Sequence, residues 1–539
     1  MAKYESIADL INVTFQDATN HVSFNTDDIM GLVMPYYWGV SDTMGVYNKT
    51  SFYEVFPESL PIGVTSLSVA DKEVFSGYAQ VKSFFAHGGG MVEVYRPLCG
   101  FGYQRMTIKS GNVSTLEIAA DGKQHDETAE VSIALKYAGF VPQSLATGFS
   151  NLKIKVAPIA AGGIEGYDGT DTCLRITVLG VRTGEDDVKL EEFEGSSNPN
   201  ANISGESIFL ENVVKSDFID VKVFSGMNSF TASEQSLVSY SSAALATVAD
   251  KVEEAYKYFR DYEKSSATLL INPFVTQTGN DDYEDINDDI AQAAERRKNC
   301  LAVIGYPIEK AFDKAAIKTY FRGLNAYGDK FAVAMSGREI ISLFGYRFTL
   351  NCVGGYCGRL IGTARDQHVN QVASGYTYGL YGGSLKESLL SGEVIELMED
   401  DGINSIYVSA RGNTIFGTRT MYSKQTSYFG KLNVMRVCAA ILKNIFPIAI
   451  ETLHTDAASN PITRASLSTM LNSIIGTFID SQDLFDDSEA DCSDSINTDY
   501  LTRGGTVLNI ILTLHFIGLV EKVNIKVIAT DTSVSAEFV

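Results

Sequence analysis

Two short apolar runs with a helical pattern between them constrain this 539-residue chain more than any other feature. Residues 269–271 (LLI) stop before Pro273, and residues 300–304 (CLAVI) stop at Gly305. Residues 286–298, between the runs, have the apolar spacing of an α-helix. A strand, a helix and a second strand in this order form a βαβ unit, whose two strands are parallel. The sequence therefore predicts a body built on a parallel sheet.

The same alternation of apolar strands and helices recurs on both sides of a region of different character. The further elements that we expect are strands at 29–34 and 91–95, a helix at 74–86, a helix at 233–260, and strands at 331–335 and 347–352. This pattern assigns residues 26–97 and 231–370 to one α/β body.

Residues 98–230 interrupt that body with weak helical periodicity and short β-type runs between turns. Three such runs lie at 152–156, 174–178 and 219–223. We expect an inserted, β-rich domain here. A chain of this length exceeds one hydrophobic core, so several domains are expected in any case.

The C-terminal part, residues 371–539, mixes helices and strands. Residues 401–420 read as a turn, a strand, a second turn and another strand. Helices are expected at 427–445 and 463–479, then an acidic loop at 483–494 and strands at 507–517 and 521–530. The whole chain is therefore predicted to be an α+β multidomain protein.

Residues 1–25 read as an extended arm, because apolar and polar residues alternate in two short stretches. No hairpin partner lies next to these stretches in the sequence. Such a strand pairs with a distant part of its own chain or with another subunit, and the residues alone leave both possibilities open.

Composition restricts the partners of this protein. The 43 basic and 66 acidic residues give a net charge of −23, which disfavours direct contact with nucleic acid or with anionic membranes. The longest apolar run, residues 507–520, is too short to span a membrane, and residues 1–15 lack the pattern of a signal peptide. Seven scattered cysteines form no disulfide framework, which indicates a reducing compartment during assembly.

Motifs that carry chemistry are missing or incomplete. The run His87-Gly88-Gly89-Gly90 is similar to an esterase oxyanion loop, but the sequence has no G-x-S-x-G, so we expect a helix end there. There is no GxxxxGK[ST] phosphate loop. The acidic run at 281–289 lacks the glycine of a calcium loop and is expected to be a solvated loop and helix start. Cys352 and Cys357 have neither a second pair nor a nearby histidine, so no metal site is expected.

Several segments, in order along the chain, share a resemblance. They are Ala294-Glu295-Arg296 followed by residues 300–304, Gly402-Ile403-Asn404 followed by Gly417 and Arg419-Thr420, and Gly504-Gly505 followed by Glu521-Lys522-Val523. Together they resemble the contractile tail sheath proteins, the polymerising jackets of phage tails and related injection machines. Ala138 and Gly354-Gly355 depart from that pattern, because the family has proline at those turns.

The resemblance implies a structural subunit without enzymatic activity and without cofactors. It implies self-association as hexameric rings stacked around a tail tube, with baseplate and tail terminator proteins as further partners and no contact to nucleic acid or membrane. Contraction would drive the tube through the host envelope during genome ejection. The protein would be assembled in the host cytoplasm and located in the virion tail.

The resemblance also implies roles for particular segments. Residues 98–230 would face outward, and the N-terminal arm and the C-terminal strand would complete sheets in neighbouring subunits. The residues expected in these strands are Val13, Phe15, Val22, Phe24, Val523, Ile525 and Val527, and the hinge candidates are Asp17, Asn20, Gly504 and Gly505. Lys431, Arg436 and Lys443 are candidate tube-facing residues, with a solvated helix face as the alternative interpretation.

Two other classes of protein stay open. One is a non-contractile virion or surface assembly protein, which would form filaments of a single length. The other is an enzyme on a Rossmann-like α/β sheet. The sequence disfavours this class, because it has no phosphate loop, no catalytic triad and no set of metal ligands.

Overall fold

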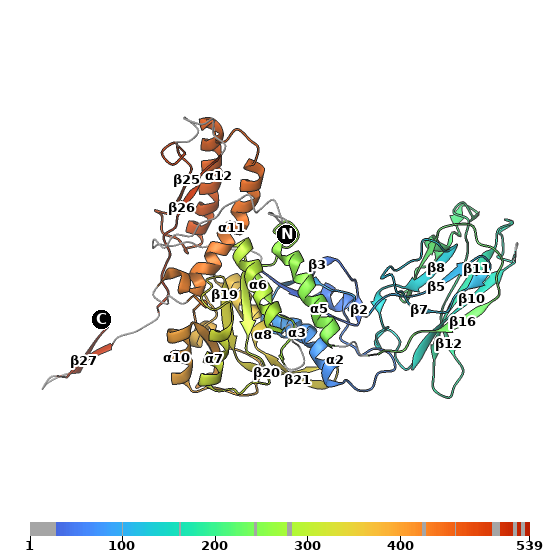
Figure 1. The fold of residues 1–539 in the computed structure, drawn as a ribbon, viewed down its shortest axis with the longest axis horizontal. Helices are drawn as coiled ribbons and strands as arrows, with labels where there is room; N and C mark the ends of the chain where they lie inside the picture. Colours follow the sequence, from blue (N-terminus) through green and yellow to red (C-terminus); the bar gives the residue numbers. More distant parts are fainter. Residues whose placement is uncertain are drawn as a thin grey trace.

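The computed structural model describes residues 28–538, except 100, 161–162, 242–244, 278–282, 423–426, 459, 498–506, 521–524 and 530–533. Helices and strands are mixed along the chain, which confirms the predicted α+β class. The predicted domain boundaries themselves stay predictions. Figure 1 shows a central body, a β-rich part at one side and a pair of helices that rises from the top of the body.

The body is built on an eight-stranded sheet with the order β24-β23-β19-β18-β17-β1-β4-β3. Its six inner strands are parallel. They are β1 (Ile29–Val33), β4 (Met91–Tyr95), β17 (Leu269–Ile271), β18 (Leu301–Gly305), β19 (Ala332–Ser336) and β23 (Ile403–Ser409). Every residue of β1, β18 and β19 is buried, as expected for a parallel sheet that is covered on both faces.

The predicted βαβ unit is confirmed, with α6 (Tyr283–Arg297) between β17 and β18. Helix α6 carries Glu284 and Asp285 in its first turn and Arg296 and Arg297 in its last turn. These charges interact favourably with the helix dipole. Helix α7 (Lys314–Gly323) connects β18 to β19 in the same way. The acidic run therefore includes the start of a helix, as expected.

An antiparallel strand closes each edge of this sheet: β3 (Met44–Asn48) beside β4, and β24 (Gly412–Phe416) beside β23. The predicted turn and hairpin at 401–420 are confirmed. Helix α10 (Ser391–Asp401) ends at Gly402, whose φ of 68° is left-handed and suits glycine.

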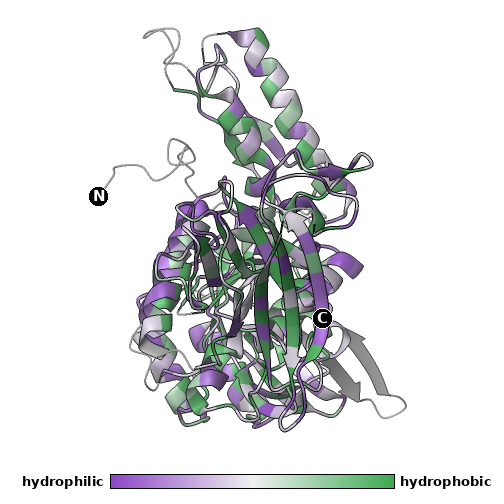
Figure 2. Cartoon of the chain, turned by 90° about the vertical axis from the view of Figure 1, so that its right-hand side faces the viewer, coloured by the Kyte–Doolittle hydropathy of each residue, from purple (hydrophilic) through white to green (hydrophobic). Residues whose placement is uncertain are grey.

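Two antiparallel sheets form the β-rich part, as expected for residues 98–230. One has the order β15-β8-β5-β6, with β6 at Asn112–Val113, and the other has the order β12-β11-β10-β16. Their long strands are β10 (Asn151–Ile159), β11 (Cys173–Val181) and β12 (Val188–Ser196), with β5 (Gln104–Lys109), β8 (Val131–Leu135) and β15 (Ile219–Val223) opposite. Figure 2 views the molecule from this side and shows hydrophilic and hydrophobic residues alternating along the strands in front.

Two sequence-based expectations are wrong. The helix expected from 233 begins only at Leu245 as α5 (Leu245–Tyr256), because β16 (Ser233–Ser236) pairs with β10 instead. The turn expected at Gly354-Gly355 is part of helix α8 (Val353–Asp366). The α8 glycines allow close packing on α3 (Ser76–Ala86), since a Cβ atom at Gly358 would lie 2.3 Å from the Phe84 carbonyl oxygen.

The C-terminal helices are α11 (Leu432–Thr452) and α12 (Pro461–Asp480). Helix α12 lies close to its predicted range of 463–479, whereas α11 begins and ends later than its predicted range of 427–445. With β25 (Glu489–Asp491) and β26 (Ile511–Thr513) they form a unit that we call the C-terminal lobe. The lobe has its own core, separate from that of the body, made of residues such as Val437, Ile441, Leu471 and Phe478. Helix α11 is long and apolar enough to cross a membrane, but most of it is buried inside the protein.

Candidate assembly interface

The N-terminal root, by which we mean Asp28 at the start of the described chain, is bound to α11. Asp28 is the first described residue, directly before β1, and Arg436 Nη2 of α11 donates a hydrogen bond of 2.7 Å to its carboxylate. Both side chains are largely buried, with exposed fractions of 10% for Asp28 and 3% for Arg436. The described chain therefore begins beside the first turns of α11.

The C-terminal root, by which we mean Ile517, is bound to the same helix through two asparagines. Asn433, one turn before Arg436, donates to Asn370 Oδ1 at 2.8 Å, and Asn370 Nδ2 donates to the Ile517 carbonyl oxygen at 3.0 Å. Leu519 then packs against the core of the body. The next described strand, β27 (Ile525–Ala529), lies away from the body in Figure 1.

Strand β27 pairs with β28 (Val534–Phe538) in an antiparallel hairpin, and within the described residues the two strands pair with no other strand. A hairpin of two strands alone is marginally stable in water. Its unpaired edges can therefore pair with another sheet.

The predicted site residues divide into two groups. Ile525 and Val527 lie in β27, so the expected terminal strand is present there. The other strand and hinge candidates lie outside the described residues: Val13, Phe15, Asp17, Asn20, Val22, Phe24, Gly504, Gly505 and Val523.

Arg436 must be removed from the candidate tube-facing residues. Its side chain is buried and paired with Asp28, 408 positions away in sequence, so it lies on no surface of the subunit. Lys431, just before α11, lies over the Tyr428 ring at 5.3 Å, and Lys443 is partly exposed. These two lysines stay candidates.

Described residues on either side of the hinge candidates Gly504 and Gly505 are hydrogen-bonded to each other. Asn497 Nδ2 donates to the Asn509 carbonyl oxygen at 3.0 Å, and the Asn509 amide donates back to Asn497 Oδ1 at 2.6 Å. The residues before and after this segment are thus bound to each other, and β26 begins soon afterwards at Ile511. Gly504 and Gly505 themselves lie outside the described residues and stay hinge candidates.

The pair β25–β26 offers one open edge. Asn472 of α12 binds β25 from its outer side, because its amide donates to the Ala490 carbonyl oxygen and accepts from the Ala490 amide, both at 2.9 Å. Within the described residues, the far edge of β26 pairs with no strand. Ile511 is half exposed on this strand. The open edge of β26 is therefore a candidate acceptor for a further strand.

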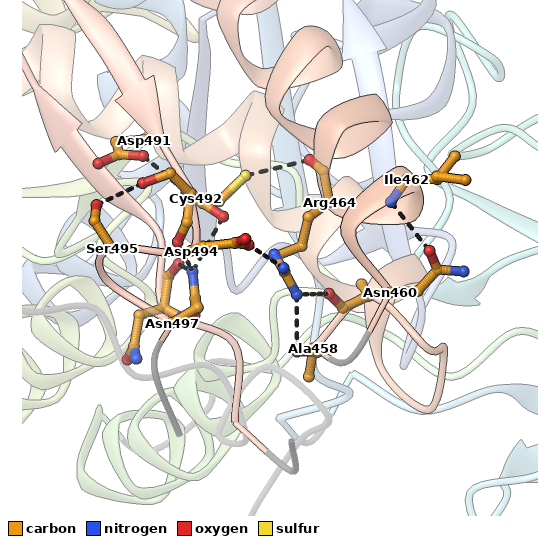
Figure 3. Close-up of polar contacts among 12 residues, drawn as sticks. Ala458, Asn460, Ile462, Arg464, Asp491, Cys492, Asp494, Ser495 and Asn497 are labelled. Atoms are coloured by element: carbon orange, nitrogen blue, oxygen red, sulfur yellow. Dashed lines mark hydrogen bonds and ion pairs between the residues drawn. The ribbon is translucent and has the colours of Figure 1, made fainter. Parts of the chain in front are cut away.

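A buried arginine holds the tip of the lobe together (Figure 3). Arg464 of α12 donates to the Ala458 carbonyl oxygen at 2.9 Å and to the Ala457 carbonyl oxygen at 3.3 Å, and it pairs with Asp494. Its own carbonyl oxygen accepts from the Cys492 thiol. The guanidinium thus links the loop before α12 to the chain after β25.

The carboxyl edge of the central sheet, where open α/β sheets bind ligands, is filled by the protein itself. Glu73, which is buried, accepts hydrogen bonds from the Val275 and Thr276 amides at 2.7 and 2.8 Å. Arg338 is also buried and donates to the Pro307 carbonyl oxygen at 2.9 Å. These side chains and backbone groups are therefore engaged in hydrogen bonds within the protein.

One hydrogen-bonded chain in the β-rich part has the residue types of a catalytic triad, which the sequence did not reveal. Ser132 Oγ lies 3.3 Å from His125 Nδ1, and His125 Nε2 lies 3.0 Å from Asp220 Oδ2. However, Ser132 is completely buried inside β8 and also accepts from the Asp126 amide. A substrate cannot reach this hydroxyl, so we interpret the chain as structural.

All seven cysteines are buried, and burial raises the pKa of each thiol. In the part of the chain that the structure describes, no group of three or more His, Cys, Asp or Glu side chains is placed to hold a metal ion.

Comparison with solved structures agrees with this architecture. The sheath tail protein of Listeria innocua is 12% identical with a TM-score of 0.50, and the alignment covers 92% of this chain and 96% of that one. The chain has the sheath protein fold. The sheath of an extracellular contractile injection system, PVC, in the contracted state is 11% identical with a TM-score of 0.50, and 99% of both chains is covered. No family model and no curated protein sequence matches this chain. The expected resemblance to sheath proteins is thus confirmed for the sheath fold.

Proposed function

We propose that this chain is the structural subunit of a contractile tail sheath. It polymerises as stacked hexameric rings around a tail tube and contracts to drive the tube through a host envelope during genome ejection. The observation that carries this proposal is the sheath fold, which spans nearly the whole chain. Tube, baseplate and tail terminator proteins are the expected partners, the virion tail is the expected location, and assembly takes place in the host cytoplasm.

Strand donation between subunits explains how such a lattice holds together. The N-terminal arm, with Val13, Phe15, Val22 and Phe24, and the C-terminal arm, with Val523, Ile525 and Val527, are the donors. The open edge of β26 is the acceptor that the geometry favours. Main-chain hydrogen bonds across this edge connect the subunits without any requirement for particular side chains.

Contraction requires that the globular parts turn while the donated strands stay paired. For the C-terminal arm, Gly504 and Gly505 stay candidates, and we add Gly518, just after Ile517, which is exposed and has open space around its Cα atom. For the N-terminal arm, Asp17 and Asn20 stay the candidates. Extended and contracted lattices are then two packings of one subunit, and the second has the lower free energy. No nucleotide hydrolysis enters this scheme.

Electron microscopy of the purified protein, alone and with its tail tube, tests the proposal. We expect hollow, striated cylinders of uniform diameter that occur in a long and a short form. Deleting residues 1–24 should give a folded subunit that does not polymerise, and so should deleting residues 520–539. A monomer under all conditions would refute the sheath proposal. Cylinders of a single length would favour the non-contractile assembly protein.

A further inference from the structure

One turn of α11 holds the roots of both terminal arms. Arg436 binds Asp28 at the start of the N-terminal side, and Asn433 binds Asn370, which binds the Ile517 carbonyl oxygen at the start of the C-terminal side. Asn433 and Arg436 are three residues apart, so they lie on one helix face. We propose that this turn couples the two arms, so that loosening one root loosens the other.

Burial makes the coupling physically necessary on the N-terminal side. Arg436 Nη1 already lacks a hydrogen-bond partner within the described residues. When Asp28 moves away, the buried guanidinium loses its carboxylate and must reach water or another acceptor. The residues of the first turns of α11 are themselves buried, so a new partner for Arg436 requires the helix to shift.

A shift of α11 would displace Ile517 through the side-chain amides of Asn433 and Asn370. Asn370 is completely buried and Asn433 is 4% exposed, so neither can replace a lost partner by water without movement. The Ile517 carbonyl oxygen is the last described link of this chain before Gly518. Coupling of this kind is reciprocal, so a change at Ile517 must also reach Asp28.

In a lattice of donated strands, this coupling would link the contacts that one subunit makes with two neighbours. It rests on the proposed function only in assigning the arms to neighbouring subunits, whereas the coupling is a property of one subunit. A pull on an N-terminal arm would weaken the hold on the C-terminal arm of the same subunit. A ring could thus pass its displacement to the next ring within each subunit.

Hydrogen exchange measured by mass spectrometry on the full-length chain tests the coupling. Asp28→Asn should accelerate exchange of the amides at 509–517 about fivefold or more, the lower end of typical coupling between sites. In the reciprocal experiment, Asn370→Ala should accelerate exchange at 29–33. The matched control is Asp289→Asn, which breaks the partly buried pair with Arg260 (2.6 Å) and should leave 509–517 unchanged.

Independent roots would give a different result. Asp28→Asn would then accelerate only 29–33, and Asn370→Ala only 509–517, which would overturn the coupling and leave the sheath proposal intact. Conversely, coupled exchange in a chain that never polymerises would refute the sheath proposal alone. If Asp28→Asn unfolds the chain, Asn433→Ala replaces it. That variant should accelerate both regions, and acceleration confined to 509–517 would overturn the coupling.

Discussion

Gly139 lies so close to Tyr37 that a Cβ atom added to it would be 1.6 Å from the Tyr37 carbonyl oxygen. The two residues lie at the junction between the β-rich part and the body. There β2 (Trp38–Gly39) pairs with β9 (Ala138–Gly139), and the buried Arg96 donates to the Ala138 carbonyl oxygen at 3.2 Å. The β-rich part is therefore fastened to the body through its backbone.

Gly139→Ala should destabilise this junction strongly. The residue has a φ of 115°, and the added methyl group meets backbone atoms that cannot move aside. We expect a loss of about 3 kcal/mol or more in the free energy of unfolding. Gly148→Ala is the control, because it also has a positive φ of 85° but nothing within 4 Å. Chemical denaturation of both variants should separate them, and equal losses would contradict this account of the junction.

Glu339→Gln should remove a pH dependence of stability. Burial raises the pKa of Glu339 from its ordinary value of 4.5 to about 7. A raised carboxyl pKa means that the stability it contributes is complete below pH 4.5 and is lost as the pH rises towards 7. The loss for the natural chain is about 3 kcal/mol.

The variant should therefore be favoured over the natural chain at pH 8 by about 3 kcal/mol more than at pH 4.5. Thermal or urea denaturation at several pH values measures this difference. Glu54→Gln changes an exposed carboxylate on α1 (Lys49–Val55) and serves as the control with little effect at any pH. A constant difference between Glu339→Gln and the natural chain would exclude titration of Glu339 in this range.

Leu471→Ala should unfold the C-terminal lobe before the body. Leu471 is completely buried in the core of the lobe, which is separate from the core of the body. Such a truncation costs about 2–5 kcal/mol. Hydrogen exchange should accelerate across α12 and β25 while β18 and β19 keep their protection. Met470→Ala, at a half-exposed neighbour, should change little. Equal acceleration in both parts would show that lobe and body unfold together.

Arg464→Met should be far more harmful than Asp494→Asn. The arginine is buried and satisfies two backbone carbonyl oxygens, whereas the Asp494 side chain is 60% exposed and can turn to water. We expect a loss of about 3 kcal/mol for the arginine variant and below about 1 kcal/mol for the aspartate variant. Denaturation followed by a probe in the lobe measures both. Similar losses would mean that the ion pair, and not the carbonyl contacts, holds the tip.

The elements that the sequence predicted well are those with local signals. The run at 269–271 ends at a proline motif, and the strand after residue 402 starts at a glycine that needs a left-handed conformation. The lobe helix at 463–479 differs from α12 by two residues at its start and one at its end. Apolar periodicity and turn residues suffice for such elements, because neighbours in sequence set them.

The failures depended on residues far away in sequence. Gly354 and Gly355 looked like a turn, but they lie in a helix that packs closely against α3 and Tyr381. Arg436 looked like a surface charge because its partner Asp28 is 408 positions away. Side-chain partners of this kind follow from packing, which a single sequence does not specify.

The buried cysteines have a practical consequence for watching this protein move. With every native thiol covered and its pKa raised, alkylating reagents have almost no thiolate to attack in the folded chain. A fluorophore or spin label attached to one introduced cysteine, for example at the exposed Ser473 of α12, would therefore mark a single position. A second label at Gly148 would allow the distance between the lobe and the β-rich part to be measured without removing any native cysteine.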